Sequence, residues 1–310
     1  MTLRAIVAAL GGDLYANGRR ANVPAPGHSR TDRSVSLLLE QDKVIVHSFG
    51  AAEWREVLDD LRRRGLIDGA ARRLLGSGSV EVRSGDRPAP PIRLSTARTL
   101  WDGGIVPAPS GVVARHLALR HVAWAQGPGG LREHPAAALS VYRAGGPVCR
   151  AMMAGIHDPD GALTAVELTY LTPAGRSPPG LRIPRKMVGV VPPGSAVRLS
   201  ALSRSMVVAE GVITTLSAMA RFQLPGWALL SAGNLARWRP PPGIARVLIA
   251  GDRGAAGEAA ALRLRDALRR RGVAAGISLP PPPWGDWNEA ALTEPGGEEE
   301  GRSGTPARRG

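Results

Sequence analysis

The chain has 310 residues, enough for two or three domains, and a formal net charge of +14. Its one cysteine, Cys149, excludes an internal disulfide and a cysteine-rich zinc site, and no run approaches the roughly 20 apolar residues of a membrane span. We therefore expect a cytoplasmic protein with a polyanionic partner, with a merely soluble basic surface as the alternative. Because only 4% of the residues are aromatic, contacts with nucleic acid would depend on phosphates rather than on stacked bases.

Residues 1–68 predict a small α/β unit. Apolar residues at helical spacing are found over residues 3–10 and again over 51–64. Two apolar runs between them, over residues 34–39 and 43–49, predict a β-hairpin. This composition and length are typical of a small, separately folded domain.

Part of a metal-binding frame is present in this unit. His28 ends a Pro-Gly-His element, and His47 begins the run His-Ser-Phe-Gly-Ala. The order of these elements resembles the zinc-binding domain of primases, in which cysteines stand at the positions of Ser48 and Ala51. Structural zinc needs four ligands, so the resemblance implies a degenerate zinc-ribbon-like domain that binds no zinc. The alternative is an unrelated hairpin with two chance histidines.

The middle of the chain is predicted to contain a linker, a helical segment and a strand-rich segment. Residues 69–97 are rich in Gly, Ser, Arg and Pro, which is typical of a linker, and helical spacing follows over 95–120. We assign 69–135 to this linker and helical segment. Residues 136–204 form the strand-rich segment, in which Asp-Pro-Asp-Gly at 158–161 is a strong turn signal.

A Gly- and Pro-rich loop is predicted near the end of the strand-rich segment, and it finishes over residues 184–189. Arg182, Arg185 and Lys186 lie in this loop and are candidate contacts for phosphates. A solvated basic loop is the equal alternative.

Residues 205–293 alternate short apolar strands with helical patterns, which predicts a parallel sheet flanked by helices. Glu210 follows the first strand of this pattern and Asp252 follows the third. Because the carboxyl ends of parallel strands share one edge of the sheet, the two carboxylates are expected to lie close together. They would hold a divalent cation against phosphate. The tail over residues 294–310 has no periodicity and is expected to be disordered.

These acids resemble the motifs of the Toprim family, which includes primases, topoisomerases and small nucleases. Glu210 and Gly211 match its first motif, and Asp252 and Gly257 match its second, in which Gly254 replaces a second aspartate. The resemblance implies that Glu210 is a general base and that both acids are magnesium ligands. The missing carboxylate implies a weak site. The alternative for Glu210 is to cap the helix that follows it.

A third element, Asp286-Trp287-Asn288, resembles the one that closes this core in phage and plasmid relatives. Asp286 is a candidate third magnesium ligand, with the N-cap of the terminal helix as the alternative. Trp287 and Asn288 are predicted to be structural residues of this motif. Arg253 adds a cation beside the acids and is a candidate phosphate contact. Further candidates, for which a solvated helix face is the alternative, are Arg263, Arg269 and Arg270.

The resemblances together imply a primase-like Toprim protein of phage, plasmid or other mobile-element type. The expected activity is magnesium-dependent synthesis of RNA primers from nucleotides on single-stranded DNA. The alternatives are a catalytically inactive nucleic-acid-binding Toprim protein, which Gly254 favours, and a Toprim-type nuclease. A topoisomerase is not expected, because the 3 tyrosines are not accompanied by a gate domain. The sequence has no helicase P-loop, so a helicase partner would be a separate chain, and no membrane partner is expected.

Overall fold

The computed structural model describes residues 3–15, 18–30, 32–40, 43–48, 54–67, 88–122, 130–181 and 183–293. Most of the expected linker, Ala51, Arg182 and the expected disordered tail over 294–310 therefore lie outside the described residues. Within the described ranges, no helix is long and apolar enough to cross a membrane.

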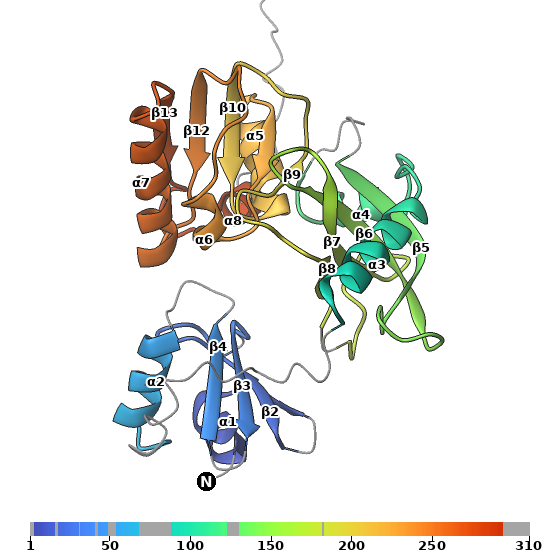
Figure 1. Cartoon of the computed structure of the whole chain (residues 1–310), viewed down its shortest axis with the longest axis vertical. Coiled ribbons are helices and arrows are strands. Elements are labelled where there is room, and N and C mark those ends of the chain that lie inside the picture. The colour runs from blue at the N-terminus through green and yellow to red at the C-terminus, as the bar shows by residue number, and fades with distance from the viewer. Residues whose placement is uncertain are drawn as a thin grey trace, which may run out of the picture.

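The N-terminal unit is a four-stranded antiparallel sheet with two helices (Figure 1). Its elements are α1 (Leu3–Leu10), β1 (Asp13–Tyr15), β2 (Arg20–Val23), β3 (Val35–Glu40), β4 (Lys43–Ser48) and α2 (Trp54–Arg63). The predicted hairpin is the β3–β4 pair. Ile6, Leu37 and Leu61 are fully buried where both helices pack on the sheet.

The histidine of the expected zinc frame has a carboxylate neighbour. Nδ1 of His28 lies 3.2 Å from Oδ2 of Asp32. The same carboxylate accepts hydrogen bonds from the hydroxyl of Ser34 and from the backbone N–H of Ala25, at 2.6 and 3.0 Å. These contacts account for the Asp32 position without a metal. The absence of zinc stays a prediction, because Ala51 lies outside the described residues.

Two helices precede the central strands, α3 (Pro90–Asp102) and α4 (Val112–Ala118). The predicted linker was too long at its end, because α3 already begins at Pro90. Proline is favoured at the first helical position, where its missing N–H would have no partner in the helix. The proline-rich composition that suggested a linker is therefore in part a helix start.

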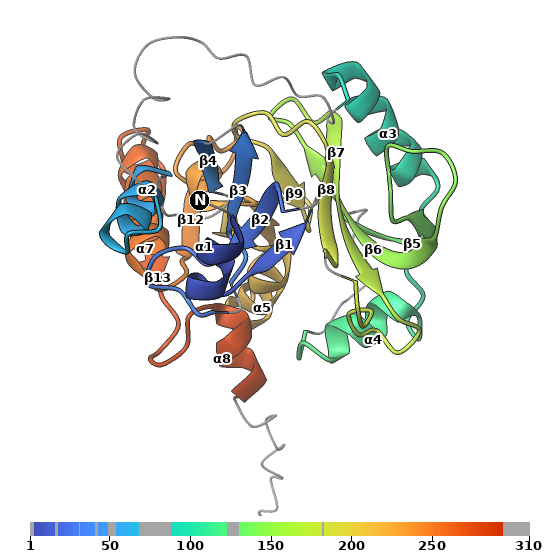
Figure 2. The same cartoon turned by 90° about the horizontal axis from the view of Figure 1, so that it is seen from below.

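A nine-stranded sheet spans the rest of the described chain. Its first five strands are β5 (Leu131–Ala138), β6 (Val148–His157), β7 (Leu163–Leu171), β8 (Arg185–Gly189) and β9 (Ala196–Arg198). These strands pair antiparallel, and the predicted turn at 158–161 joins β6 to β7. The loop expected over 184–189 is instead strand β8, because its backbone pairs with the free edge of β7. α3 and α4 cover opposite faces of these strands (Figure 2).

The C-terminal half is the predicted parallel α/β core. Its elements are β10 (Ser205–Ala209), α5 (Val212–Phe222), β11 (Gly226–Ala228), α6 (Ala232–Leu235), β12 (Arg246–Ala250), α7 (Ala255–Arg269), β13 (Ala274–Ser278) and α8 (Trp287–Thr293). The strand order is β13-β12-β10-β11, and all of these pairs are parallel. α7 covers one face of the sheet, and α5 and α8 cover the other.

Two features join the strand-rich half, from α3 to β9, to the α/β half, from β10 to α8. β9 pairs with both β6 and β11, so that one sheet continues through both halves. On one face of that sheet, α4 and α5 share a single apolar core, to which Leu117, Ile156 and Leu216 belong. The carboxyl ends of the parallel strands therefore open toward side chains of the strand-rich half.

Candidate active site

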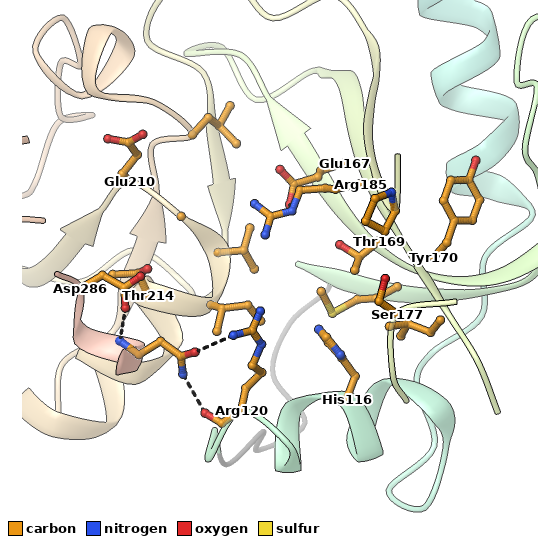
Figure 3. Close-up of a pocket in the computed structure, with 18 of the residues that line it drawn as sticks. His116, Arg120, Glu167, Thr169, Tyr170, Ser177, Arg185, Glu210, Thr214 and Asp286 are labelled. Atoms are coloured by element: carbon orange, nitrogen blue, oxygen red, sulfur yellow. Dashed lines mark hydrogen bonds and ion pairs between the residues drawn. The ribbon is translucent and has the colours of Figure 1, made fainter. Parts of the chain in front are cut away.

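Glu210 and Asp252 follow the carboxyl ends of β10 and β12, which are neighbouring parallel strands. Both acids line one cavity of about 370 Å³. The cavity lies between the two halves of the chain, and Figure 3 shows Glu210 and Asp286 on its α/β side. The structure thus places the two sequence-predicted acids at one site, while their roles as base and metal ligand stay predictions.

Burial and mutual repulsion disturb the ionisation of these acids. The pKa of Asp252 is raised to about 7, mostly by burial and in addition by the charges of Glu210, Asp286 and Glu289. Burial also raises the pKa of Glu210, and a hydrogen bond from the backbone N–H of Ala232 opposes that rise. The two acids of the cavity are therefore less readily ionised than solvated carboxyl groups, because burial and mutual repulsion disfavour their charged forms.

The contact of Glu210 with Ala232 also answers the capping alternative. α5 begins after Gly211, and no side chain caps its first turn. The carboxylate of Glu210 instead accepts the N–H at the start of α6, the short helix after β11. Its side chain is therefore held at the edge of the sheet rather than on the helix that follows it.

The residues present fit a magnesium ion completed by substrate. Oδ1 of Asp252 is buried and has no hydrogen-bond partner among the described residues, and Glu210 lies in the same cavity. Magnesium is usually held by one or two carboxylates together with phosphates and waters, which matches this pair. No cluster of three or more His, Cys, Asp or Glu side chains within the described ranges is arranged to hold a metal alone.

Two glycines shape the loop that carries Asp252. A Cβ at Gly257 would lie 2.6 Å from the carbonyl oxygen of Asp252, so only glycine lets α7 begin this close to the loop. Gly254 has a φ of +111°, which L-residues rarely adopt. An aspartate at position 254 would be strained here, so the missing Toprim carboxylate is accompanied by a backbone that does not suit it.

The Asp286-Trp287-Asn288 element both closes the core and borders the cavity. Oδ1 of Asp286 accepts the backbone N–H groups of Asn288 and Glu289 at 2.7 and 2.8 Å, which is the N-cap of α8. Asp286 also lines the cavity, so the cap and the candidate ligand are one side chain. The Trp287 ring packs edge-on against Phe222, with 4.9 Å between ring centres.

Asn288 links the two halves beneath the cavity. Its amide nitrogen donates to the carbonyl oxygen of Arg120, at 2.7 Å, and to the hydroxyl of Ser217 on α5, at 3.1 Å. Arg120 follows α4, and its guanidinium also approaches the Asn288 side-chain oxygen (Figure 3). Asn288 thus has a structural role, because its side chain fixes the position of the segment that carries Arg120.

The wall opposite the acids comes from the strand-rich half, and the sequence reasoning had missed most of it. His116, Arg120 and Glu167 line it, together with the predicted Arg185 (Figure 3). Nε of Arg185 lies 4.0 Å from a carboxylate oxygen of Glu167. Burial raises the pKa of Glu167, and the nearby Arg185 charge opposes this. A glutamate within a mostly apolar strand was a further sequence signal for this wall, besides the predicted Arg185.

The surroundings of His116, on the same wall, favour its neutral form. Burial lowers its pKa most, and the charges of Arg120 and Arg185 lower it further, against a hydrogen bond to Gly175 that raises it. Nδ1 lies 2.8 Å from the carbonyl oxygen of Gly175, so Nδ1 carries the proton and donates it to this bond. The other ring nitrogen then has a free lone pair.

The remaining predicted phosphate contacts lie elsewhere. Arg253 donates to the carbonyl of Pro280, at 2.6 Å, and the ammonium of Lys186 donates to the carbonyl of Leu139. Arg269 donates to the carbonyl of Ala275 at the opposite end of the strands. Arg263 and Arg270 are exposed on and just after α7, and Arg182 lies outside the described residues. Of these predicted contacts, Arg185 alone lines the cavity within the described part of the chain.

Comparison with known protein families finds two matches, each over about a third of the chain or less. The Toprim domain matches residues 205–295, and a domain of unknown function (DUF7146) matches residues 93–199. No curated protein matches the sequence.

Similar solved structures include primases. The primase fragment of the bacteriophage T7 primase-helicase is 16% identical, with 61% of this chain and 70% of that chain covered and a TM-score of 0.38. The Aquifex aeolicus primase, with its zinc-binding and RNA polymerase domains, is 12% identical, with coverages of 93% and 78% and a TM-score of 0.38. The RNA polymerase domain of the Mycobacterium tuberculosis primase is 12% identical, with coverages of 64% and 67% and a TM-score of 0.32.

Proposed function

We propose that this protein, whose residues 205–295 are a Toprim domain, is a primase-like nucleotidyltransferase that joins ribonucleotides into a short RNA primer on single-stranded DNA. The supporting observation is a cavity with acids on one wall and arginines on the other. Glu210 and Asp252 come from the Toprim side, and Arg120 and Arg185 from the strand-rich side. Nucleotidyl transfer uses both kinds of group, since carboxylates hold magnesium and accept a proton while cations offset phosphate charge.

In the proposed reaction, the 3′-hydroxyl of one nucleotide attacks the α-phosphorus of the next, and the bond from that phosphorus to pyrophosphate breaks. Glu210 accepts the hydroxyl proton, and because burial raises its pKa, its carboxylate is a stronger base than a solvated glutamate. Asp252 would hold magnesium, since its buried Oδ1 has no hydrogen-bond partner among the described residues. When bound, the ion supplies positive charge to the phosphates. Arg120 and Arg185 position those phosphates from the opposite wall.

The template and the biological context belong to the same proposal. The net charge of +14 supports binding of single-stranded DNA through its phosphates. The resemblance of the motifs to phage and plasmid proteins supports a role in the replication of mobile-element DNA, with a separate helicase as partner.

A primer-synthesis assay tests the proposal. The full chain is incubated with single-stranded DNA and labelled ribonucleotides, with magnesium or manganese, and the products are separated on a gel. Labelled oligoribonucleotides are expected from the wild type and from Asp266→Asn, a control that removes a carboxylate from α7 outside the cavity. Glu210→Gln and Asp252→Asn are expected to lose product at least a hundredfold. No product with either metal, or full activity in Glu210→Gln, would overturn the proposal.

A catalytically inactive nucleic-acid-binding protein is the second candidate, and the backbone at Gly254 favours it. That position lacks the second Toprim aspartate, and its φ of +111° does not suit one. An inactive protein would bind single-stranded DNA and form no product in the same assay. A Toprim nuclease would shorten end-labelled DNA, which the same gel resolves.

A further inference from the structure

A second cavity lies at the opposite end of the parallel strands from the acids. It has a volume of about 450 Å³ and opens on the face of the sheet that α5 and α8 cover. We call it the amino-end groove, and it is lined by Ser205, Met206, Leu224, Arg246, Val247, Leu248, Ala274, Ala275 and Gly276. In Figure 1 the strands β10 and β12 start at the top, which is where the groove lies.

The described part of α8, up to Thr293, covers only part of this face. α8 packs Trp287 and Ala290 against the carboxyl-end half of the strands, near Ala209 and Ala250. Within the described residues, no helix packs on that face over the starts of β12 and β13. Gly276 leaves the floor open, since the nearest atom to a Cβ placed there is Cδ1 of Leu248, at 4.0 Å. The result is an apolar floor at an otherwise polar edge.

Arginine is the one charged residue type at this edge within the described segments that meet there, and Arg246 lines the groove itself. Four segments meet at this edge, namely residues 201–207, 219–226, 243–248 and 267–277, because Ser205 pairs with Arg246, and Arg246 pairs with Ala274. They contain no aspartate or glutamate. Their exposed arginines are Arg246, which lines the groove, Arg204 and Arg221, and, at the end of the helix on the other face of the sheet, Arg269, Arg270 and Arg271. The edge therefore combines an apolar groove with a positive rim.

We propose that the amino-end groove binds an acidic peptide segment of a partner protein, with apolar side chains on the floor and carboxylates on the arginine rim. Charge complementarity selects this occupant. A second copy of the chain is disfavoured, because its own groove would bring the same arginines against the rim. Nucleic acid would satisfy the rim but not the floor, which has no aromatic ring for stacking a base.

The position of the groove supports a partner rather than the template. Five residue steps separate Ser205, at the start of β10, from Glu210, a distance of roughly 16 Å along the strand. A template held at this edge would lie away from the acids, whereas a docked partner would leave the active cavity open. The groove is therefore suited to recruitment of this chain to another protein.

A binding measurement tests the inference with the full chain. The probe is a short fluorescent peptide of aspartates interspersed with leucines and phenylalanines, and its affinity is followed by fluorescence anisotropy at low and moderate salt. A peptide with serines in place of the apolar residues, and oligothymidylate of equal charge, are compared with it. The apolar acidic peptide is expected to bind at least tenfold more tightly than the serine peptide.

Two pairs of variants locate the binding. Gly276→Leu fills the groove and should weaken the peptide at least tenfold, whereas Gly233→Leu adds the same side chain at an open helical position and should not. Arg246→Glu should weaken it similarly, and Arg263→Glu, on the exposed middle of α7, should not. Equal affinity for the serine peptide, no binding at low salt, or full binding by Gly276→Leu would overturn the inference. Loss of oligothymidylate binding in place of peptide binding would assign the rim to nucleic acid.

Discussion

Replacing Asp252 with asparagine should stabilise the protein above neutral pH, at the expense of its metal site. The pKa of Asp252 is raised from 3.8 to about 7 by burial and by the neighbouring acids. Between these two values the unfolded chain releases the Asp252 proton while the folded chain retains it, so folded stability falls as the pH rises through this window. A rise of this size corresponds to a loss of at most about 4 kcal/mol in the free energy of unfolding, and the whole loss is present above pH 7.

The prediction concerns a difference between variants at two pH values. Asp252→Asn removes the charge and keeps the shape, so it should unfold like the wild type near pH 4 and be more stable at pH 8 in the presence of a chelator. At about 2–4 °C per kcal/mol, the melting temperature should rise by at most about 8–16 °C. Asp266→Asn is the matched control, since this carboxylate is partly exposed on α7 beside Arg265.

Magnesium should shift the stability of the wild type in the opposite direction from ionisation of Asp252, which gives a second test. Adding the ion at pH 8 should raise the melting temperature of the wild type, because the cation relieves the repulsion at Asp252, and should leave Asp252→Asn unchanged. The reasoning is refuted if Asp252→Asn gains no stability over the wild type between pH 4 and pH 8.

Four further outcomes are expected. Gly257→Ala should lose about 1–3 kcal/mol in urea unfolding, because its Cβ would lie 2.6 Å from the Asp252 carbonyl, whereas Gly233→Ala, in open space, should cost far less. Asn288→Ala should cost about 1–3 kcal/mol in the same measurement, because the Arg120 carbonyl and a buried hydroxyl lose their donor. Affinity for single-stranded DNA should fall about a thousandfold between 50 and 200 mM salt if about six phosphates are contacted, as titrations at several salt concentrations will measure. Metal analysis of the purified chain should find well under one zinc per chain, and stoichiometric zinc lost together with the N-terminal fold on chelation would contradict the degenerate ribbon.

The parallel core was predictable because its signals are local. Each strand is a short apolar run, each helix has its own periodicity, and the acids follow their strands directly in sequence. Once the alternation of strand and helix implies parallel pairing, the common edge of Glu210 and Asp252 follows from topology. The same local reasoning predicted the β6–β7 turn and the hairpin of the N-terminal unit.

The opposite wall was not predictable in this way. His116, Arg120 and Glu167 precede the Toprim acids by between about forty and more than a hundred residues. They reach the cavity because β9 pairs with β11 and because α4 and α5 share one apolar core. Pairing between distant strands leaves no periodicity in either segment. Strand β8 was missed for a related reason, since the edge of β7 rather than its own Gly- and Pro-rich flanks makes it a strand.

Because Gly254 stands where the Toprim family has a second aspartate, fewer protein ligands are available to bind a metal in the cavity. One carboxylate oxygen of Asp286 already accepts two hydrogen bonds at the N-cap of α8, so Asp286 is a poor substitute for the aspartate that Gly254 replaces. Glu210 and Asp252 then supply the only strong ligands predicted from the Toprim side, and magnesium completes its shell with waters and phosphate oxygens. The arginines of the opposite wall attract those phosphates to the same cavity. We therefore expect metal and nucleotide to bind together. The cation offsets the negative charge of the carboxylates and the phosphates, and the phosphates supply oxygen ligands that the two carboxylates alone do not.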